Sequence, residues 1–161
     1  ENILKNCLAP IKESYDYVLI DCPPSLAMLT INALSAADEV LIPVQAQYLP
    51  AKGMTKLLRT VSKVQRKINS NLKIAGVAIT LADLKTNLAK DTIEMIHENF
   101  GQHFKVFNSV IPVAVKASEA TVSGKSVYSY ARDSKVAVAY DELTKEVIHA
   151  SKEKRRSDLI R

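Results

Sequence analysis

Short apolar runs alternate with longer amphipathic stretches along the chain. The runs are residues 17–20, 40–44, 74–79 and, more weakly, 106–111. They are continuous rather than alternating, and such runs are typical of strands that are covered on both faces, as in a parallel sheet. Pro23 and Pro24 follow the first run, so the first strand has to end at Asp21. We therefore predict four strands of a mainly parallel sheet.

The stretches between the runs predict helices. Residues 26–37 are rich in Ala and Leu, residues 50–69 carry one apolar stripe at helical spacing, and residues 89–100 do the same before Gly101. A last helix is marked by Val136, Tyr140, Leu143, Val147 and Ala150. The order β-α-β-α-β-α-β-loop-α is that of a three-layer, doubly wound α/β fold.

The two ends of the chain predict how it is organised. Residues 3–8 have the pattern of a trailing helix, so we expect strands before it, a sheet incomplete on its N-terminal side, and a fragment of a longer domain. Residues 1–151 would form the C-terminal part of that single domain. Residues 152–161 are charged and end with only two apolar side chains, too few for membrane anchoring, so we expect a flexible tail.

Charge is distributed unevenly. Residues 1–50 carry two Lys against six acids, a balance of −4, whereas residues 51–161 carry twenty Lys and Arg against eleven acids, a balance of +9. The basic part favours an acidic partner, with nucleic acid the usual candidate, although surface lysines that only solubilise the protein give the same count. Cys7 and Cys22 have no CxxC spacing, and we expect both to be reduced core residues.

Asp21 is the first candidate site residue. A buried strand that ends in a carboxylate presents it at the edge of an open α/β sheet where ligands bind. A single carboxylate there can hold Mg²⁺ through a water, because Mg²⁺ gives up its waters reluctantly. Many strands also end in Asp simply as a helix or turn cap.

The residues around Asp21 extend the pattern. Residues 15–25, Tyr-Asp-Tyr-Val-Leu-Ile-Asp-Cys-Pro-Pro-Ser, resemble the Walker B signature of the ParA/Soj partition ATPases. The resemblance continues at residues 29–34, 36–38, 40–45, 86–88, 111–112 and 118–120. It implies a P-loop NTPase-type fold, binding of ATP and Mg²⁺, a homodimer, non-specific DNA binding and a ParB-type centromere-binding partner. It also implies a cytoplasmic, nucleoid-associated protein for segregation of a plasmid or chromosome, in which Asp21 holds Mg²⁺ through a water.

The nucleotide loop of that family, shaped KGGxGKT, does not occur in these residues. A phosphate loop needs closely spaced glycines, whereas the four glycines here are far apart, at Gly53, Gly76, Gly101 and Gly124. Gly124 begins a Gly-Lys-Ser sequence, but Glu119 stands where a P-loop needs its first glycine. The family is a Mg²⁺-dependent ATPase. For this chain alone we predict no ATP turnover and no tight binding of ATP or Mg²⁺.

The segment 111–120 resembles the family's IPR-x-V-x-x-SEA loop, which borders the adenine. Val113 replaces the usual arginine, so the resemblance implies that Pro112, Val113 and Ala114 contact the adenine through their backbone. An ordinary strand-to-helix loop is the alternative for this segment.

Basic residues cover one face of the predicted helix 50–69. The face holds Lys52, Lys56, Arg59, Lys63, Arg66 and Lys67, with no acid among them. A solvated helix usually mixes signs, so an all-basic face favours a polyanion. Lys85 and Lys116 stand at positions where the family has DNA-binding arginines. We therefore expect DNA contacts from Lys56, Arg59, Lys63, Lys85 and Lys116.

Two other functions remain open from the sequence. The chain could be a ParA-like interaction module that never binds ATP, or a MinD-like division-site regulator at the membrane. The polar tail argues against the second, and we expect no membrane partner.

Overall fold

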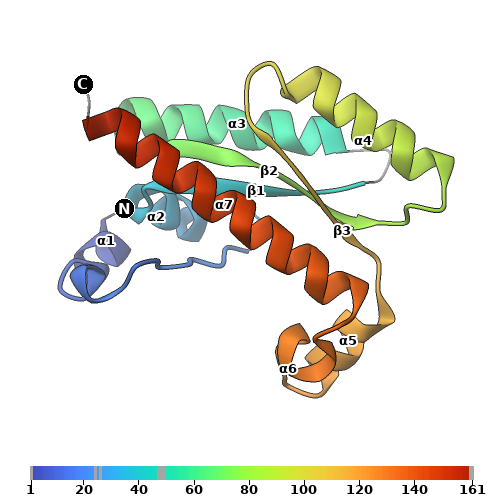
Figure 1. The fold of residues 1–161 in the computed structure, drawn as a ribbon. Helices are drawn as coiled ribbons and strands as arrows, with labels where there is room; N and C mark the ends of the chain where they lie inside the picture. Colours follow the sequence, from blue (N-terminus) through green and yellow to red (C-terminus); the bar gives the residue numbers. More distant parts are fainter. Residues whose placement is uncertain (1, 24, 26, 47–49, 160–161) are drawn as a thin grey trace. The chain divides into compact units, whose positions relative to one another are not determined.

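The computed structural model describes residues 2–23, 25, 27–46 and 50–159. The chain forms two compact units, one of Glu1–Val40 with Ala51–Ile74, the other of Leu41–Pro50 with Ala75–Arg161. The described elements, all but η1 labelled in Figure 1, are α1 (Ile3–Leu8), η1 (Lys12–Ser14), α2 (Met28–Ala36), β1 (Glu39–Gln45), α3 (Pro50–Lys67), β2 (Lys73–Ala82), α4 (Asn87–Phe100), β3 (Val106–Pro112), α5 (Val115–Val122), α6 (Val127–Ala131) and α7 (Lys135–Leu159).

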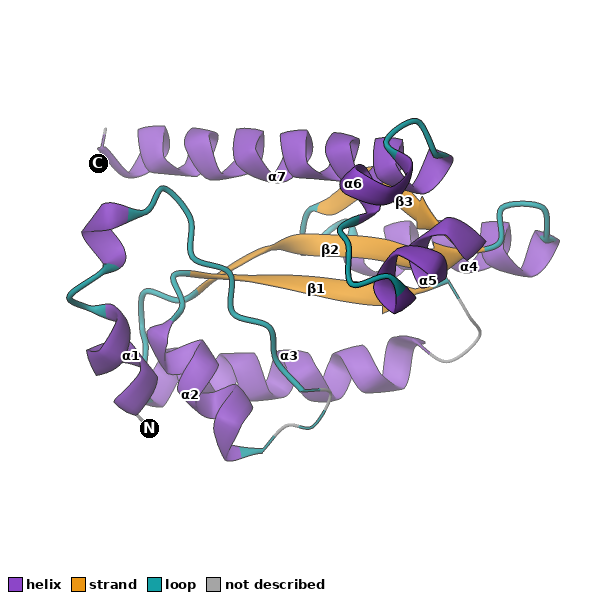
Figure 2. Ribbon diagram, turned by 90° about the horizontal axis from the view of Figure 1, so that it is seen from below, coloured by secondary structure: helices purple, strands orange, loops and turns teal. Residues whose placement is uncertain are grey.

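The fold is α/β with a parallel three-stranded sheet in the order β1-β2-β3, drawn as arrows in Figure 2. The predicted runs 40–44, 74–79 and 106–111 are confirmed as these three strands. Residues 75–79 of the central strand β2 are all buried, as a continuous apolar run predicts. In β1 and β3 buried and exposed residues alternate instead.

Pro43 lies inside strand β1 without breaking its pairing. On either side of β1, the carbonyl of Asp38 accepts a hydrogen bond from the N–H of Lys73 at 2.9 Å, and the N–H of Ala46 donates to the carbonyl of Thr80 at 3.1 Å. The backbone N–H and C=O groups of even-numbered residues therefore point toward β2. Pro43 is odd-numbered and therefore points its missing N–H away from β2. A proline is tolerated in a strand at such an outward-facing position.

The core of the first unit joins α2, α3 and the start of β2. It contains Leu34, Val61, Val64 and Leu72, all nearly inaccessible to solvent. The side-chain amide of Asn69, just after α3, donates to the carbonyls of Leu34 (3.0 Å), Ser35 (3.3 Å) and Ala37 (2.8 Å). The carbonyls of Leu34 and Ser35 lie in the last turn of α2, where the helix itself provides no donors, and Ala37 is the residue that follows the helix. Asn69 therefore fixes the C-terminal end of one helix from the end of another.

The core of the second unit lies between β2, β3 and α7. Phe107 and Ile111 of β3 pack with Val136, Leu143 and Ala150 of α7. The predicted stripe of α7 is thus largely confirmed. Tyr140 is 40% exposed, and the neighbouring Ala139 is buried in its place. A small side chain fits closer to the sheet than a tyrosine does, so the stripe is shifted by one residue there.

The prediction of a buried strand at residues 17–20 is wrong for this structure. The segment has no secondary structure, and Leu19 is 94% exposed. A strand persists only while its N–H and C=O groups pair with a neighbouring strand, and none of the described strands pairs with this segment. An apolar run fixes what a strand would bury but does not provide its partner.

Three smaller expectations also differ from the structure. Cys7 and Cys22 are both exposed, so neither is a core residue, because α1 and the 17–23 segment bury no side chain. Helix α7 runs to Leu159, through most of the predicted tail, since Lys, Glu and Arg favour helix. The segment predicted as a loop to Ala120 is helix α5 from Val115 onward.

Candidate functional site

Asp21 follows residues 17–20, which have no regular secondary structure, in the first unit. It is exposed, and no three His, Cys, Asp or Glu side chains among the described residues are grouped to hold a metal ion. Next to it the Cys22 thiol donates to the carbonyl of Ile20 at 3.7 Å, and partial burial together with the charge of Asp21 raises the pKa of that thiol. One exposed carboxylate without a phosphate loop does not by itself form a Mg²⁺–nucleotide site.

The predicted adenine loop lies at the carboxyl end of β3 in the second unit. Pro112 is the last residue of β3, and Ala114 precedes α5, where its carbonyl accepts from the N–H of Ala117 at 3.1 Å. The N–H of Val113 donates to the carbonyl of Ala82 at 3.1 Å, which joins this loop to the end of β2. The side chain of Val113 is 61% exposed. Because the side chain is apolar, only the backbone here can make polar contacts with a ligand.

Lys85 lies in the loop that follows β2. Asp83 shapes this loop: its carboxylate accepts from the N–H of Lys85 at 3.2 Å, and its carbonyl accepts from the Thr86 N–H at 2.9 Å. The Thr86 hydroxyl then caps α4 by accepting from the N–H of Ala89 at 3.2 Å. These bonds hold Lys85, which is exposed, on an ordered turn at the same sheet edge as Pro112.

Lys116 is engaged within its own unit. Its ammonium lies 2.9 Å from a carboxylate oxygen of Glu119 and 5.6 Å from the centre of the Tyr130 ring, and the Tyr130 hydroxyl donates to the same Glu119 oxygen at 3.2 Å. The hydrogen bond from Lys116, reinforced by that of Tyr130, lowers the pKa of Glu119, and the bond to Glu119 raises the pKa of Lys116. Lys116 therefore carries its charge beside a compensating one.

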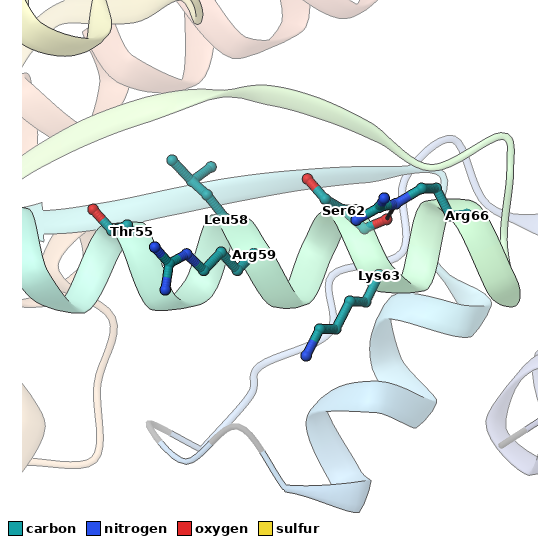
Figure 3. A pocket seen from close by; sticks show the side chains of 6 residues that line it. All are labelled: Thr55, Leu58, Arg59, Ser62, Lys63 and Arg66. Atoms are coloured by element: carbon teal, nitrogen blue, oxygen red, sulfur yellow. Dashed lines mark hydrogen bonds between the residues drawn. The ribbon is translucent and has the colours of Figure 1, made fainter.

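The basic residues of α3 form the second predicted surface, in the first unit. Lys56, Arg59 and Lys63 are exposed, as are Arg66 and Lys67. None of the five forms an ion pair within the described part of the chain. Beside them a hollow of about 480 Å³, shown in Figure 3, is lined by Thr55, Leu58, Arg59, Ser62, Lys63 and Arg66.

The structure therefore divides the predicted residues between its two units. Asp21 and the α3 bases belong to the first, and Lys85, Lys116 and the Pro112–Ala114 loop belong to the second. Within the second unit, Lys85 and the loop are joined through the ends of β2 and β3.

Sequence reasoning missed the interactions of two carboxylates, Glu119 and Glu146. Glu119 as the partner of Lys116 could have been found from their spacing of three residues on a helix. Glu146 of α7, which binds the backbone of Asn108 and Ser109, gives a weaker signal: it is an acid beside the apolar positions Leu143 and Val147. Both carboxylates bind groups of the chain itself.

None of the described helices combines the length and the apolar composition that crossing a membrane would need.

Comparison with known proteins finds a matching family model and several similar sequences. A family model described as an AAA domain matches residues 1–74. The chain is 44% identical over 148 residues to the chromosome-partitioning ATPase Soj of Treponema pallidum, covering 92% of this chain and 58% of that protein. It is 46% identical over 144 residues to the sporulation initiation inhibitor protein Soj of Bacillus subtilis, covering 89% of this chain and 56% of that protein. The chain thus spans little more than half the length of these relatives.

Among solved structures, the chain is similar to cobyrinic acid a,c-diamide synthase from Mycobacterium smegmatis with a bound ATP analogue and magnesium. The TM-score is 0.72 at 35% identity, over 88% of this chain and 51% of that one. The α/β arrangement described above is therefore shared with a nucleotide-binding enzyme.

Proposed function

The chain belongs to the ParA/Soj family of partition ATPases, and on that basis we propose that it forms part of an ATPase that segregates plasmid or chromosomal DNA. The similarity to two Soj proteins over about nine tenths of the chain carries this proposal. In the complete protein, ATP drives formation of a homodimer that binds DNA without sequence preference, and a ParB-type protein stimulates hydrolysis. The protein works in the cytoplasm, on the nucleoid.

Asp21 contributes the magnesium side of the nucleotide site in this proposal. Phosphoryl transfer depends on positioned charge from a loop lysine, Mg²⁺ and an oriented water. The 161 residues supply the carboxylate of Asp21 but no pair of closely spaced glycines for a phosphate loop. The chain alone therefore binds ATP weakly and does not turn it over.

The loop Pro112–Ala114 contributes the base side of the same site. Its N–H and C=O groups border the adenine, while the Val113 side chain adds no polar contact. Support comes from its position at the carboxyl end of β3, the edge at which open α/β sheets bind their ligands.

DNA contact is assigned to the basic residues of both units. Lys85 and Lys116 lie at the carboxyl edge of the sheet, and Lys56, Arg59 and Lys63 lie on α3. Lysine preserves the attraction to phosphate that the family's arginines provide, but it lacks the two-pronged guanidinium.

Nucleotide titration by calorimetry tests the proposal. The present chain is compared with a version extended upstream by a segment that carries the family's KGGxGKT loop. We expect Mg²⁺-dependent ATP binding and hydrolysis by the extended version only, with hydrolysis abolished by Asp21→Ala. Turnover by the present chain that Asp21→Ala removes would contradict the role given to the missing loop.

A non-catalytic ParA-like interaction module is the second candidate, favoured by the wide separation of the four glycines. The same experiment separates the two. If the extended version also fails to bind ATP, the module is the better description.

A further inference from the structure

Helix α3 lies in a long stretch without negative charge. Between Val40 and Ala82 the sequence has seven Lys and Arg and no acid. Lys56, Arg59, Lys63 and Arg66 follow each other at intervals of three or four residues, so they lie on one side of the helix. At about 1.5 Å per residue they form a track about 15 Å long, with neighbouring charges about 4.5–6 Å apart.

The hollow beside this track has polar hydroxyls as well as charges. Thr55 and Ser62 line it together with Arg59, Lys63 and Arg66, and Leu58 is its one apolar member. Figure 3 shows Arg59 and Lys63 projecting from the same side of the helix. Arg66 uses only its Nε–H, which donates to the carbonyl of Ser62 at 3.3 Å, so four of its five guanidinium N–H donors remain for a ligand within the described part of the chain.

Lys116 differs from these residues. Its ammonium is held by Glu119 and lies over Tyr130, and a phosphate would have to compete with that carboxylate. The α3 bases have no such competitor within the described residues. An anion therefore meets less opposition on α3 than at Lys116.

We propose that the hollow lined by Arg59, Lys63 and Arg66 holds the sugar–phosphate backbone of double-stranded DNA. This inference rests on the proposed function and concerns one of the two surfaces to which that function assigns DNA contact. On each strand, duplex DNA carries one phosphate per about 3.4 Å of helix axis, which is closer than the spacing of neighbouring basic residues in the track, so each basic residue can contact a different phosphate. The lining contains no aromatic side chain on which an unpaired base could stack, which favours duplex over single-stranded DNA. Its polar side chains are Arg, Lys, Ser and Thr, all of which commonly contact phosphate oxygens, and this fits contact with the backbone.

The test measures binding of the 161-residue chain to a labelled random-sequence duplex by fluorescence anisotropy, over a range of salt concentrations. The hollow variant combines Arg59→Gln, Lys63→Gln and Arg66→Gln, the three charged residues that line the hollow. The control variant combines Lys90→Gln, Lys125→Gln and Lys135→Gln, three changes at residues that are also exposed in the structure, and lowers the net charge by the same amount. Gln is nearly as good a helix former as Lys and Arg, and circular dichroism checks that both variants fold.

We expect the slope of log K against log salt to become less steep by about 2.7 in the hollow variant, three contacts at about 0.9 each, and to stay unchanged in the control. Wild type should also bind the duplex more tightly than a single strand of the same length. Three outcomes would overturn the assignment to this hollow but leave DNA contact in place: an equal change of slope in the two variants, an unchanged slope in the hollow variant, or tighter binding of wild type to the single strand. Absence of any DNA binding at low salt, both by the 161-residue chain and by the upstream-extended version with ATP and Mg²⁺, would contradict the DNA contact of the proposed function as well.

Discussion

Glu146 on helix α7 accepts hydrogen bonds from both donors of Ser109 on strand β3, its N–H and its hydroxyl. The Ser109 N–H donates to the Glu146 carboxylate at 2.7 Å and its hydroxyl donates to the same oxygen, while the N–H of Asn108 donates to the other oxygen at 2.9 Å. In the register of β2 with β3, Val77 pairs with Val106 and Ile79 with Val110, so β3 has two extra residues between these pairs. A bulge of this kind leaves backbone groups without ladder partners. Glu146 provides the acceptor that they lack.

Replacing Glu146 by Ala should lower the free energy of unfolding by about 1.5–3 kcal/mol, because the N–H and hydroxyl of Ser109, which are partly buried, and the exposed N–H of Asn108 lose a charged acceptor. Urea denaturation measures the change. Glu142→Ala, one turn earlier on α7 and exposed, is the control and should change stability by less than about 0.5 kcal/mol. Equal effects of the two substitutions would show that the bulge does not depend on Glu146.

The same carboxylate gives a pH dependence. Burial alone would raise the pKa of Glu146, but the hydrogen bonds from Ser109 and Asn108 and the charge of Lys105 together hold it below its ordinary value of 4.5. A group whose folded pKa is depressed stabilises the fold above its unfolded pKa, and this stability is lost as the pH falls through the folded pKa. The stability difference between wild type and Glu146→Ala should therefore be constant near neutral pH and shrink below pH 4.5. A difference that stays constant down to pH 3 would contradict this.

Gly76 and Gly53 should respond oppositely to Ala. A Cβ at Gly76 would lie 2.7 Å from the carbonyl oxygen of Lys105 and 2.7 Å from the Phe107 ring, so Gly76→Ala should destabilise by about 1–3 kcal/mol. A Cβ at Gly53 on α3 meets nothing within 4 Å, and Gly53→Ala should stabilise by roughly 0.5–1 kcal/mol through helix propensity. Thermal melts of both variants check the opposite signs.

Asn69 should matter for the end of α2. Asn69→Ala removes the donor to the Leu34, Ser35 and Ala37 carbonyls and should cost about 1–3 kcal/mol in urea denaturation. Asn71→Ala, two residues on and exposed, is the matched control with little expected effect. If Asn69→Ala is as harmless as the control, α2 is capped by water instead.

Releasing Lys116 should strengthen binding to DNA. Glu119→Gln removes the negative charge beside Lys116 and should make the negative slope of log K against log salt steeper by about 0.9, one additional phosphate contact. Glu98→Gln on α4 makes the same change in net charge at another exposed site and should leave the slope unchanged. A slope that becomes equally steeper in both variants would show that the effect comes from net charge alone.

Much of the fold could be predicted from local pattern. The runs at 40–44, 74–79 and 106–111 became β1, β2 and β3, and the apolar stripes placed α3, α4 and most of the buried face of α7. These features depend on the period of apolar positions, which the sequence carries in every few residues. The family resemblance rests on equally local motifs, and the similarity to two Soj proteins agrees with it.

The remaining features depend on partners distant in the sequence. Residues 17–20 have the composition of a strand, yet Leu19 is exposed because no described strand pairs with the segment. Glu146 lies 37 residues from Ser109, Asn69 lies 35 from Leu34, and Tyr130 lies 11 from Glu119. The sequence by itself determined which residues could form strands, helices and charged faces. Only the tertiary structure decided which of their polar groups are already paired and which remain for a ligand, because a hydrogen bond depends on where the chain brings both partners.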